Sequence, residues 1–157
     1  MSAIKFIKDL YGESSEYYLA TLAKYQDKSD EILIKSCKGF IEDSNLSDKS
    51  KEVLFLFYGI GRPRKTLLEI GNMYNVTDSY IWSLKNNALK KLRDNIDVGN
   101  LGLSVRVRNC LKRADCMTIK ELKSLNLKAL KKVRNLGDIG IDEIISALKP
   151  LGIKLAP

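Results

Sequence analysis

Two helix starts separated by one tight turn, between residues 66 and 93, constrain the fold of this chain more than any other feature. Thr66 and Glu69 have the spacing of a capping box, which predicts a short helix. Asn75 to Asp78 interrupts that helix and opens a longer one, whose apolar residues are Ile81, Leu84, Ala88, Leu89 and Leu92. A short helix, a tight turn and a longer amphipathic helix predict a helix-turn-helix.

Another helix precedes this pair. Ser47 is a natural N-cap for an apolar helix that runs through Val53 and Phe57. Two glycines and a proline in the stretch 59–63 then end it, since both residue types break a helical pattern.

Residues 1–45 are expected to be helical throughout, with no residues suited to chemistry. Apolar residues recur there at spacings near three and four, namely Tyr17, Tyr18, Leu22 and Tyr25, then Ile32, Ile34, Cys37 and Phe40. This pattern predicts helices near 14–26 and 28–42. We expect them to pack as a helical pair on the next domain or on a partner.

Composition limits the compartment and the cofactors. The longest apolar runs, such as 53–57, are far shorter than the roughly 20 residues that span a bilayer, and the N-terminus lacks a secretory signal pattern. We therefore expect a cytoplasmic protein without membrane association. Cys37, Cys110 and Cys116 fit neither a disulfide framework nor a C-x-x-C site, so we expect reduced thiols, no metal and no cofactor.

The chain has no histidine, which removes the commonest general base and excludes Ser-His-Asp or Cys-His catalysis. We expect no enzyme and no catalytic residues. The net charge of +8 grows along the sequence: residues 1–45 carry 6 basic and 8 acidic residues, 46–97 carry 9 and 6, and 98–157 carry 12 and 5. This gradient predicts contact with an anionic polymer such as double-stranded DNA, although a solvated lysine-rich surface is an alternative.

A polar stretch with glycine, residues 94–100, predicts a linker to a third segment. Ser104 is placed to cap a helix in which Arg106, Asn109 and Arg113 recur at spacings of three and four on one face. A guanidinium beside an amide suits a narrow minor groove, where the negative potential attracts arginine.

The same segment contains Asn135-Leu136-Gly137, which predicts the turn of a helix-hairpin-helix because asparagine and glycine tolerate positive φ. A helix is expected to open directly after it, at Asp138 or Ile139. Free amides at such a helix start are able to bind a phosphate.

Two stretches resemble known families of transcription proteins. Residues 46–93 resemble region 4 of the primary sigma factors, through the stretches 66–71 and 88–93. Residues 101–144 resemble the C-terminal domain of the RNA polymerase alpha subunit, through Leu-Ser-Val-Arg-x-x-Asn-Cys-Leu-Lys from Leu103 and Asn-Leu-Gly from Asn135. The apolar spacing of residues 1–45 and the two resemblances together predict an all-α protein in three parts. These are an N-terminal helical segment (1–45), a sigma region 4-like helix-turn-helix (46–97) and a compact domain with a helix-hairpin-helix (98–157).

The alpha-domain resemblance implies that Arg106 and Asn109 enter the minor groove of A·T-rich DNA. The full DNA-binding set that it implies is Arg106, Asn109, Cys110, Arg113, Gly137, Ile139, Gly140 and Glu143. The family commonly has lysine and serine where this sequence has Ile139 and Gly140. Contact with the DNA backbone there must therefore rely on amides and neighbouring lysines.

The sigma-like resemblance implies a recognition helix for the major groove, with Tyr80, Trp82, Ser83 and Lys85 on its DNA-binding side. The family carries arginine, glutamate and glutamine there, and bidentate contacts from such residues are the main source of base readout. Their loss implies a different target sequence or no base readout. Tyr80 and Trp82 either contact thymine methyl groups or pack against a protein partner.

Together these features predict an accessory transcription factor. It would bind promoter-type DNA, with the C-terminal domain in the minor groove and the helix-turn-helix in the adjacent major groove, and act on recruitment of bacterial-type RNA polymerase through the beta flap or a sigma factor. The alternative is an interaction protein that occupies the polymerase surface on which sigma region 4 docks, with little DNA contact. A DNA-repair accessory protein is a third and weaker candidate, because no carboxylate cluster with metal spacing is present.

Overall fold

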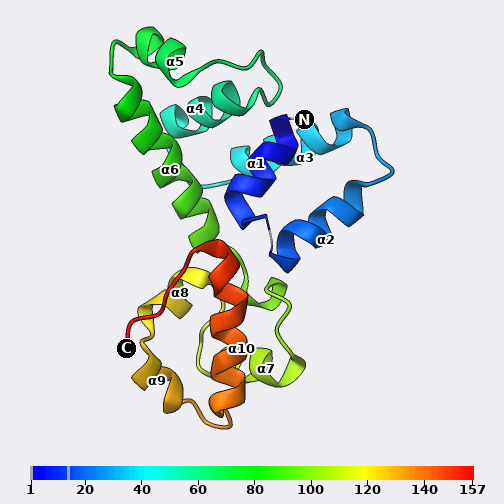
Figure 1. Cartoon of the computed structure of the whole chain (residues 1–157), viewed down its shortest axis with the longest axis vertical. Helices are drawn as coiled ribbons and strands as arrows, with labels where there is room; N and C mark the ends of the chain where they lie inside the picture. Colours follow the sequence, from blue (N-terminus) through cyan, green and yellow to red (C-terminus); the bar gives the residue numbers. More distant parts are fainter. Residues whose placement is uncertain (1, 14) are drawn as a thin grey trace. The chain divides into compact units, whose positions relative to one another are not determined.

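A computed structural model describes residues 2–13 and 15–157. These residues form ten α-helices and two short 3-10 helices and contain no β-strand, which confirms the predicted all-α class (Figure 1). The protein divides into two compact units. Unit 1 takes the residues up to Leu10 and Leu22–Leu92, and unit 2 takes Tyr11–Thr21 and Arg93–Pro157.

Six helices contribute to unit 1: α1 Ser2–Tyr11, α2 Glu16–Tyr25, α3 Asp30–Glu42, α4 Asp48–Tyr58, α5 Leu67–Tyr74 and α6 Asp78–Asp94. The helices predicted near 14–26 and 28–42 correspond to α2 and α3. Residue 14 and the side chain of Tyr17 lie outside the described part of the structure. A separate helix over α1 was not predicted, yet α1 buries Phe6, Ile7 and Leu10.

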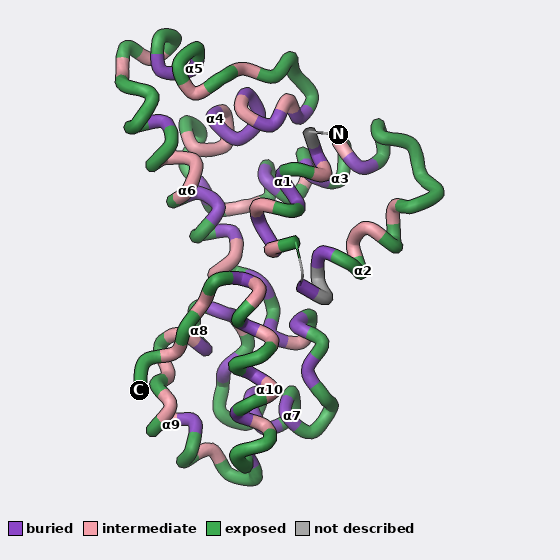
Figure 2. Tube along the Cα trace, in the orientation of Figure 1, coloured by how far each residue is buried: buried purple, intermediate pink, exposed green. Residues whose placement is uncertain are grey.

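Helix α4 forms the centre of unit 1, and most of its second half is buried (Figure 2). Ser47 caps its start by accepting a hydrogen bond from the Ser50 N–H, as predicted. The Tyr58 ring contacts the Phe6 ring of α1 at 5.3 Å between centroids, and the Tyr58 hydroxyl donates to Asp9 at 2.7 Å. The first helix is therefore joined to α4 by both apolar and polar contacts.

The helix-turn-helix forms as predicted. Thr66 and Glu69 make both hydrogen bonds of a capping box, and Asn75 ends α5 with a left-handed φ of 56°. Gly71 allows the turn to close, because a Cβ there would lie 2.7 Å from the Val76 carbonyl oxygen. The two helices and α4 share a core made of Val53, Leu56, Ile70 and Ile81.

Unit 2 is built around α7 Val105–Arg113, α8 Ile119–Ser124, α9 Leu127–Lys131 and α10 Asp138–Leu148, with 3-10 helices at Val98–Asn100 and Lys149–Leu151. Its core draws on every one of these α-helices, with Leu111, Ile119, Leu122, Leu130, Ile144 and Leu148 all fully buried. Ser104 caps α7 by accepting from the Val107 N–H, and α10 begins at Asp138, both as predicted.

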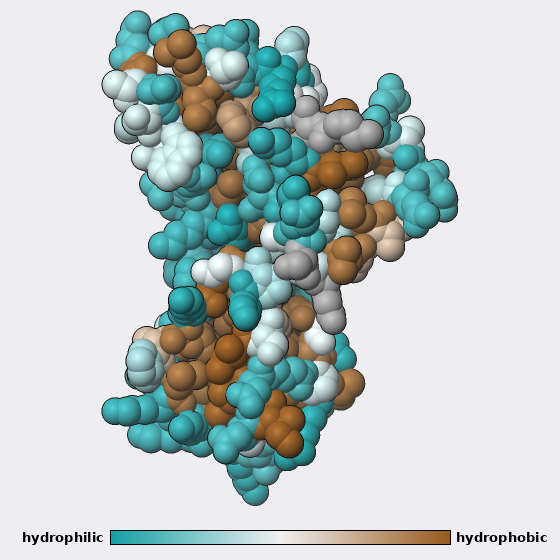
Figure 3. Space-filling view, in the orientation of Figure 1, coloured by the Kyte–Doolittle hydropathy of each residue, from teal (hydrophilic) through white to brown (hydrophobic). Residues whose placement is uncertain are grey.

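The surface of unit 2 also carries apolar side chains. Figure 3 shows hydrophobic residues on the face of this unit that contains α10, with hydrophilic residues around them. Two isoleucines of α10, Ile139 and Ile145, are among the exposed large hydrophobic side chains. Helix α10 therefore contributes both to the core and to the surface of its unit.

The predicted linker 94–100 is instead a packed part of unit 2. Ile96 and Val98 are buried, and the Val98 N–H donates to the Met117 carbonyl at 2.8 Å. The Ile119 N–H donates to Ile96 at 3.0 Å, so this stretch runs antiparallel to the start of α8. The sequence predicted a linker because only two apolar residues, Ile96 and Val98, are interspersed among polar residues and a glycine.

Residues 11–21 also belong to unit 2, which no sequence pattern indicated. Tyr11, Ser15 and Tyr18 are buried there. Gly12 has a φ of +81°, and a Cβ on it would lie 2.1 Å from the carbonyl oxygen of Pro150. Only glycine fits this close approach of two backbones.

Candidate nucleic-acid interface

Helix α7 presents a basic surface. Its sequence holds four cations and no acidic residue, and Arg106, Asn109 and Arg113 are all exposed, at helical spacings that place them on one face. Cys110 lies elsewhere: its side chain is 2% exposed and packs in the core beside Leu111. Its thiol is thus not on the surface, and we leave Cys110 out of the candidate interface.

The hairpin turn lies next to α7. Asn135 takes a positive φ of 66°, while Gly137 is extended with φ −85° and serves as the N-cap of α10. Asparagine alone therefore supplies the left-handed residue that the turn needs. Gly140 is required for packing, because a Cβ there would lie 2.7 Å from the Leu136 side chain and 3.3 Å from the Val107 side chain. Its missing side chain lets the first turn of α10 approach α7.

These elements enclose a surface hollow of about 450 Å³. Five of the predicted DNA-binding residues line it together: Arg106, Gly137, Ile139, Gly140 and Glu143. The hollow is also lined by Ser104, Val107, Asn135, Leu136 and Asp138. The structure thus brings the first turn of α7 and the hairpin turn into a single concave surface, called here the α7–α10 hollow.

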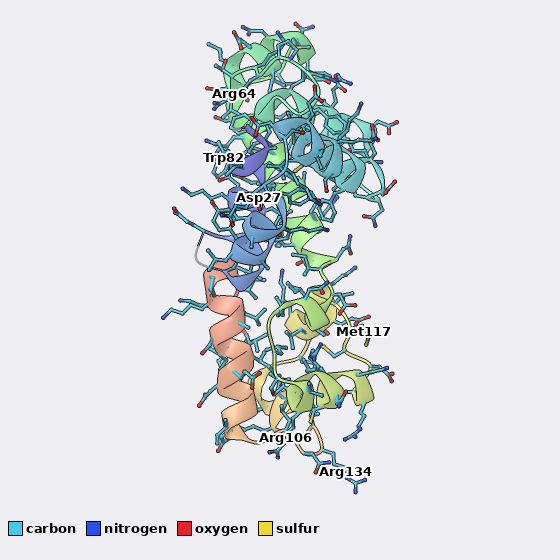
Figure 4. All side chains as sticks on the ribbon, turned by 90° about the vertical axis from the view of Figure 1, so that its right-hand side faces the viewer. Asp27, Arg64, Trp82, Arg106, Met117 and Arg134 are labelled. Carbon is cyan, nitrogen blue, oxygen red and sulfur yellow. The ribbon has the colours of Figure 1, made fainter. Side chains whose placement is uncertain are left out.

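Asn109 lines a second, smaller hollow of about 290 Å³ on the neighbouring side of α7, together with Val105, Met117, Arg108 and Lys112. The two cations there were not among the predicted site residues. Arg134 was also missed, although it is exposed and directly precedes the turn residue Asn135. Figure 4 shows Arg106 and Arg134 near the same end of unit 2, with Met117 farther toward the other end. The missed residues Arg108, Lys112 and Arg134 are all basic and lie close in sequence to predicted contact residues, which is the signal that could have identified them.

Glu143 has a structural partner within the hollow. Its carboxylate accepts a hydrogen bond from the Ser104 N–H, and its second oxygen accepts from the Ser104 hydroxyl at 3.1 Å. Ser104 is the N-cap residue of α7, so Glu143 ties the start of that helix to α10. Glu143 lines the same hollow as Arg106, and its hydrogen bonds to Ser104 hold the start of α7 in place.

The exposed face of α6 is aromatic and polar. Tyr80 is 46% and Trp82 is 55% exposed, and Ser83 is exposed as well. The Lys49 ammonium lies 5.2 Å from the centroid of the Tyr80 ring, which leaves Trp82 as the bare aromatic side chain of the first two turns. From Asp78 to Leu84 the helix has no basic residue.

Lys85 does not share that face. Its ammonium lies 4.5 Å from the centroid of the Phe57 ring in α4, where Lys5 (5.7 Å) and the Arg64 guanidinium (5.9 Å) also approach. Burial lowers the pKa of Lys85, with Asp9 opposing the shift and Lys5 adding to it. The Lys85 ammonium thus makes a cation–π contact with Phe57. It does not lie on the exposed face that carries Tyr80, Trp82 and Ser83.

Two family models match this protein. Residues 44–94 match the one described as "Sigma-70, region 4", and residues 84–150 match the one for the C-terminal domain of the bacterial RNA polymerase alpha subunit. Both predicted resemblances are confirmed. The two matches share residues 84–94, which form the C-terminal part of α6.

Curated proteins that match this chain include DNA-directed RNA polymerase alpha subunits. One from Desulforamulus reducens is 39% identical over 88 residues, which are 56% of this chain and 28% of that subunit. One from Clostridium beijerinckii is 40% identical over 81 residues, 52% of this chain and 26% of the subunit. The chain spans about a quarter of the length of these relatives. No solved structure matches it.

Within the described residues, no helix is long and apolar enough to cross a membrane. No group of three or more histidine, cysteine, aspartate or glutamate residues is arranged there to hold a metal ion.

Proposed function

We propose that this protein is a DNA-binding accessory transcription factor without enzymatic activity, which acts in the cytoplasm on recruitment of a bacterial-type RNA polymerase. The observation that carries the proposal is the joining of Arg106 and the hairpin turn in the α7–α10 hollow. An exposed arginine beside a turn suits a narrow minor groove. Arg113 and the excess of basic residues in 98–157 add positive charge to the same unit, and Asn109 adds an amide to the exposed face of α7.

The proposal gives unit 2 the main DNA contact, in A·T-rich minor groove. An arginine is attracted to a narrow groove by its enhanced negative potential, and A·T-rich tracts have such grooves. The likeness to the alpha-subunit domain supports the same assignment. Gly137 would allow the DNA backbone to approach the turn closely, since it carries no side chain and a Cβ there would meet no atom within 4 Å.

A second candidate function is favoured by α6. The first two turns of α6 expose Asp78, Tyr80 and Trp82 and contain no basic residue, and Lys49 of α4 lies over the Tyr80 ring. Few cations and two aromatic rings favour a protein surface over a phosphate backbone. On this alternative, the helix-turn-helix would occupy the polymerase surface on which sigma region 4 docks, and DNA contact would be confined to unit 2 or be absent.

The test compares DNA and polymerase binding in the same variants. Gel shifts on an A·T-rich duplex should show binding that Arg106→Ala weakens by about 1–3 kcal/mol. Lys120→Ala, which removes one charge from the exposed surface of α8, is the matched control and should bind like the parent. Equal affinity of parent and Arg106→Ala would contradict the minor-groove contact.

The role of α6 is tested by Trp82→Ala. Its side chain is 55% exposed, so the substitution should leave the fold intact. Loss of capture by core RNA polymerase with unchanged gel shifts would place α6 on protein, as in the second candidate. Loss of DNA affinity with unchanged polymerase capture would place α6 on DNA.

A further inference from the structure

One side chain on the rim of the α7–α10 hollow has an unexpected chemistry. Ile139 is 85% exposed, the highest value among the exposed large hydrophobic side chains of the described residues. It is the second residue of α10, and its neighbours Gly137 and Gly140 carry no side chains that would cover it. The isoleucine therefore stands alone above the surface, in the same hollow as Arg106.

The charges around Ile139 argue against a phosphate at this helix start. Asp138 precedes it as the first helical residue, and Asp142 follows one turn later, so the amides of α10 are flanked by negative charge. No basic side chain lies in α10 itself. Arg106, which also lines the hollow, supplies the cation to this part of the surface.

An arginine that enters a minor groove is flanked by the two sugar-phosphate walls of that groove. The faces of those walls that point into the groove are deoxyribose carbons, an apolar surface. Minor-groove proteins frequently use apolar side chains, isoleucine among them, on DNA, mostly as wedges between base steps. We propose that Ile139 packs against the deoxyribose wall of the minor groove that receives Arg106. The hairpin turn then holds DNA by apolar contact in place of an ion pair. This inference rests on the proposed function and assigns the chemistry of one of its residues.

The proposal predicts that loss of the Ile139 contact lowers the affinity for DNA without changing how that affinity depends on salt concentration. A contact with phosphate releases counterions, and each such contact adds about 0.9 to the absolute value of the negative slope of log K against log salt concentration. An apolar contact adds affinity and leaves that slope unchanged. The measurement is therefore the binding of the full-length protein to a fluorescent A·T-rich duplex at several salt concentrations.

Four variants make the test specific. Ile139→Ser should weaken binding about three- to ten-fold at every salt concentration with the slope unchanged. Arg106→Ala should lower the affinity and reduce the absolute value of the slope by about 0.9. Ile139→Lys should increase the absolute value of the slope by a similar amount. Ile145→Ser, on another face of α10 and 40% exposed, is the apolar control and should bind like the parent.

The outcomes separate this inference from the proposed function. Parental affinity in Ile139→Ser, beside weak binding by Arg106→Ala, would overturn the apolar contact and leave the DNA-binding function standing. A lower slope in Ile139→Ser would also overturn it, since the turn would then hold a phosphate. Absence of binding by the parent protein would overturn the function itself. Thermal melts of each variant confirm that the fold is intact, as expected for so exposed a side chain.

Discussion

Glu143 and Ser104 are 39 residues apart in the sequence, and the carboxylate of the first accepts both the N–H and the hydroxyl hydrogen of the second. The Ser104 hydroxyl accepts the Val107 N–H at the same time. This arrangement fixes the start of α7, and with it Arg106, relative to α10.

The first prediction concerns this tie. Glu143→Ala should lower the free energy of unfolding by about 1 kcal/mol and weaken DNA binding several-fold, because the N-terminal turn of α7 loses its fixed position. Glu143→Gln keeps one acceptor oxygen and should recover part of both losses. Chemical denaturation and gel shifts provide the two measurements. Tighter DNA binding by Glu143→Ala without a loss of stability would show instead that the carboxylate acts through its charge on DNA.

Two glycines in helices allow a paired prediction. Gly71→Ala places a Cβ against the backbone of the helix-turn-helix turn and should destabilise the protein by about 1–3 kcal/mol. Gly39→Ala in α3 meets no atom within 4 Å and should stabilise it by about 0.5–1 kcal/mol, because alanine favours the helix. Urea melts of both variants measure the two effects. Similar changes in both would refute the steric explanation for Gly71.

Lys85 should matter little for DNA. Its ammonium lies over Phe57, and burial lowers its pKa because the charged form is poorly solvated in the folded state. Lys85→Met removes that desolvated charge and should keep or raise the free energy of unfolding. The lowered pKa implies that the parent gains stability as the pH rises from the folded toward the unfolded pKa of Lys85, and the variant should lack this gain. A loss of DNA affinity as large as that of Arg106→Ala would show that Lys85 leaves the ring to bind DNA.

The thiols should be unreactive in the folded protein. Burial raises the pKa of Cys37 to about 11, and burial with help from Glu121 raises the pKa of Cys116 to about 11, so roughly one such thiol in a thousand is ionised at pH 8. Cys110 is buried as well. Ellman's reagent should therefore titrate three thiols only after unfolding in guanidinium. Rapid reaction of one thiol in the native protein would contradict this burial.

Local signals predicted the elements that carry the candidate site. The hydrogen bonds of Ser47, Thr66 and Ser104 depend on residues within three positions, so the sequence alone was enough to locate the helix starts. The same holds for the left-handed Asn135 in the hairpin turn. Such features are encoded over a few residues and need no knowledge of distant partners.

Side-chain partners that are distant in sequence were not predictable. The spacing of residues in α7 did not predict the burial of Cys110, because a small apolar thiol fits either face of a helix. The direction of Lys85 depends on Phe57, which lies 28 positions earlier in another helix. Glu143 was expected near DNA, and its bond to Ser104 depends on the packing of α10 against α7. Each of these contacts is set by how helices assemble.

The close approach of Gly12 to the Pro150 carbonyl has a consequence for the order of events on a ribosome. Residues 11–21 are synthesised before residues 93–157 but belong to the same unit as those later residues. Unit 1 has all its residues once Leu92 has emerged, whereas this early segment must wait for its partner to be made. A nascent polypeptide stalled before residue 150 would hold Tyr11 and Tyr18 without the complete unit to which they belong, so proteases and chaperones would have access to this segment.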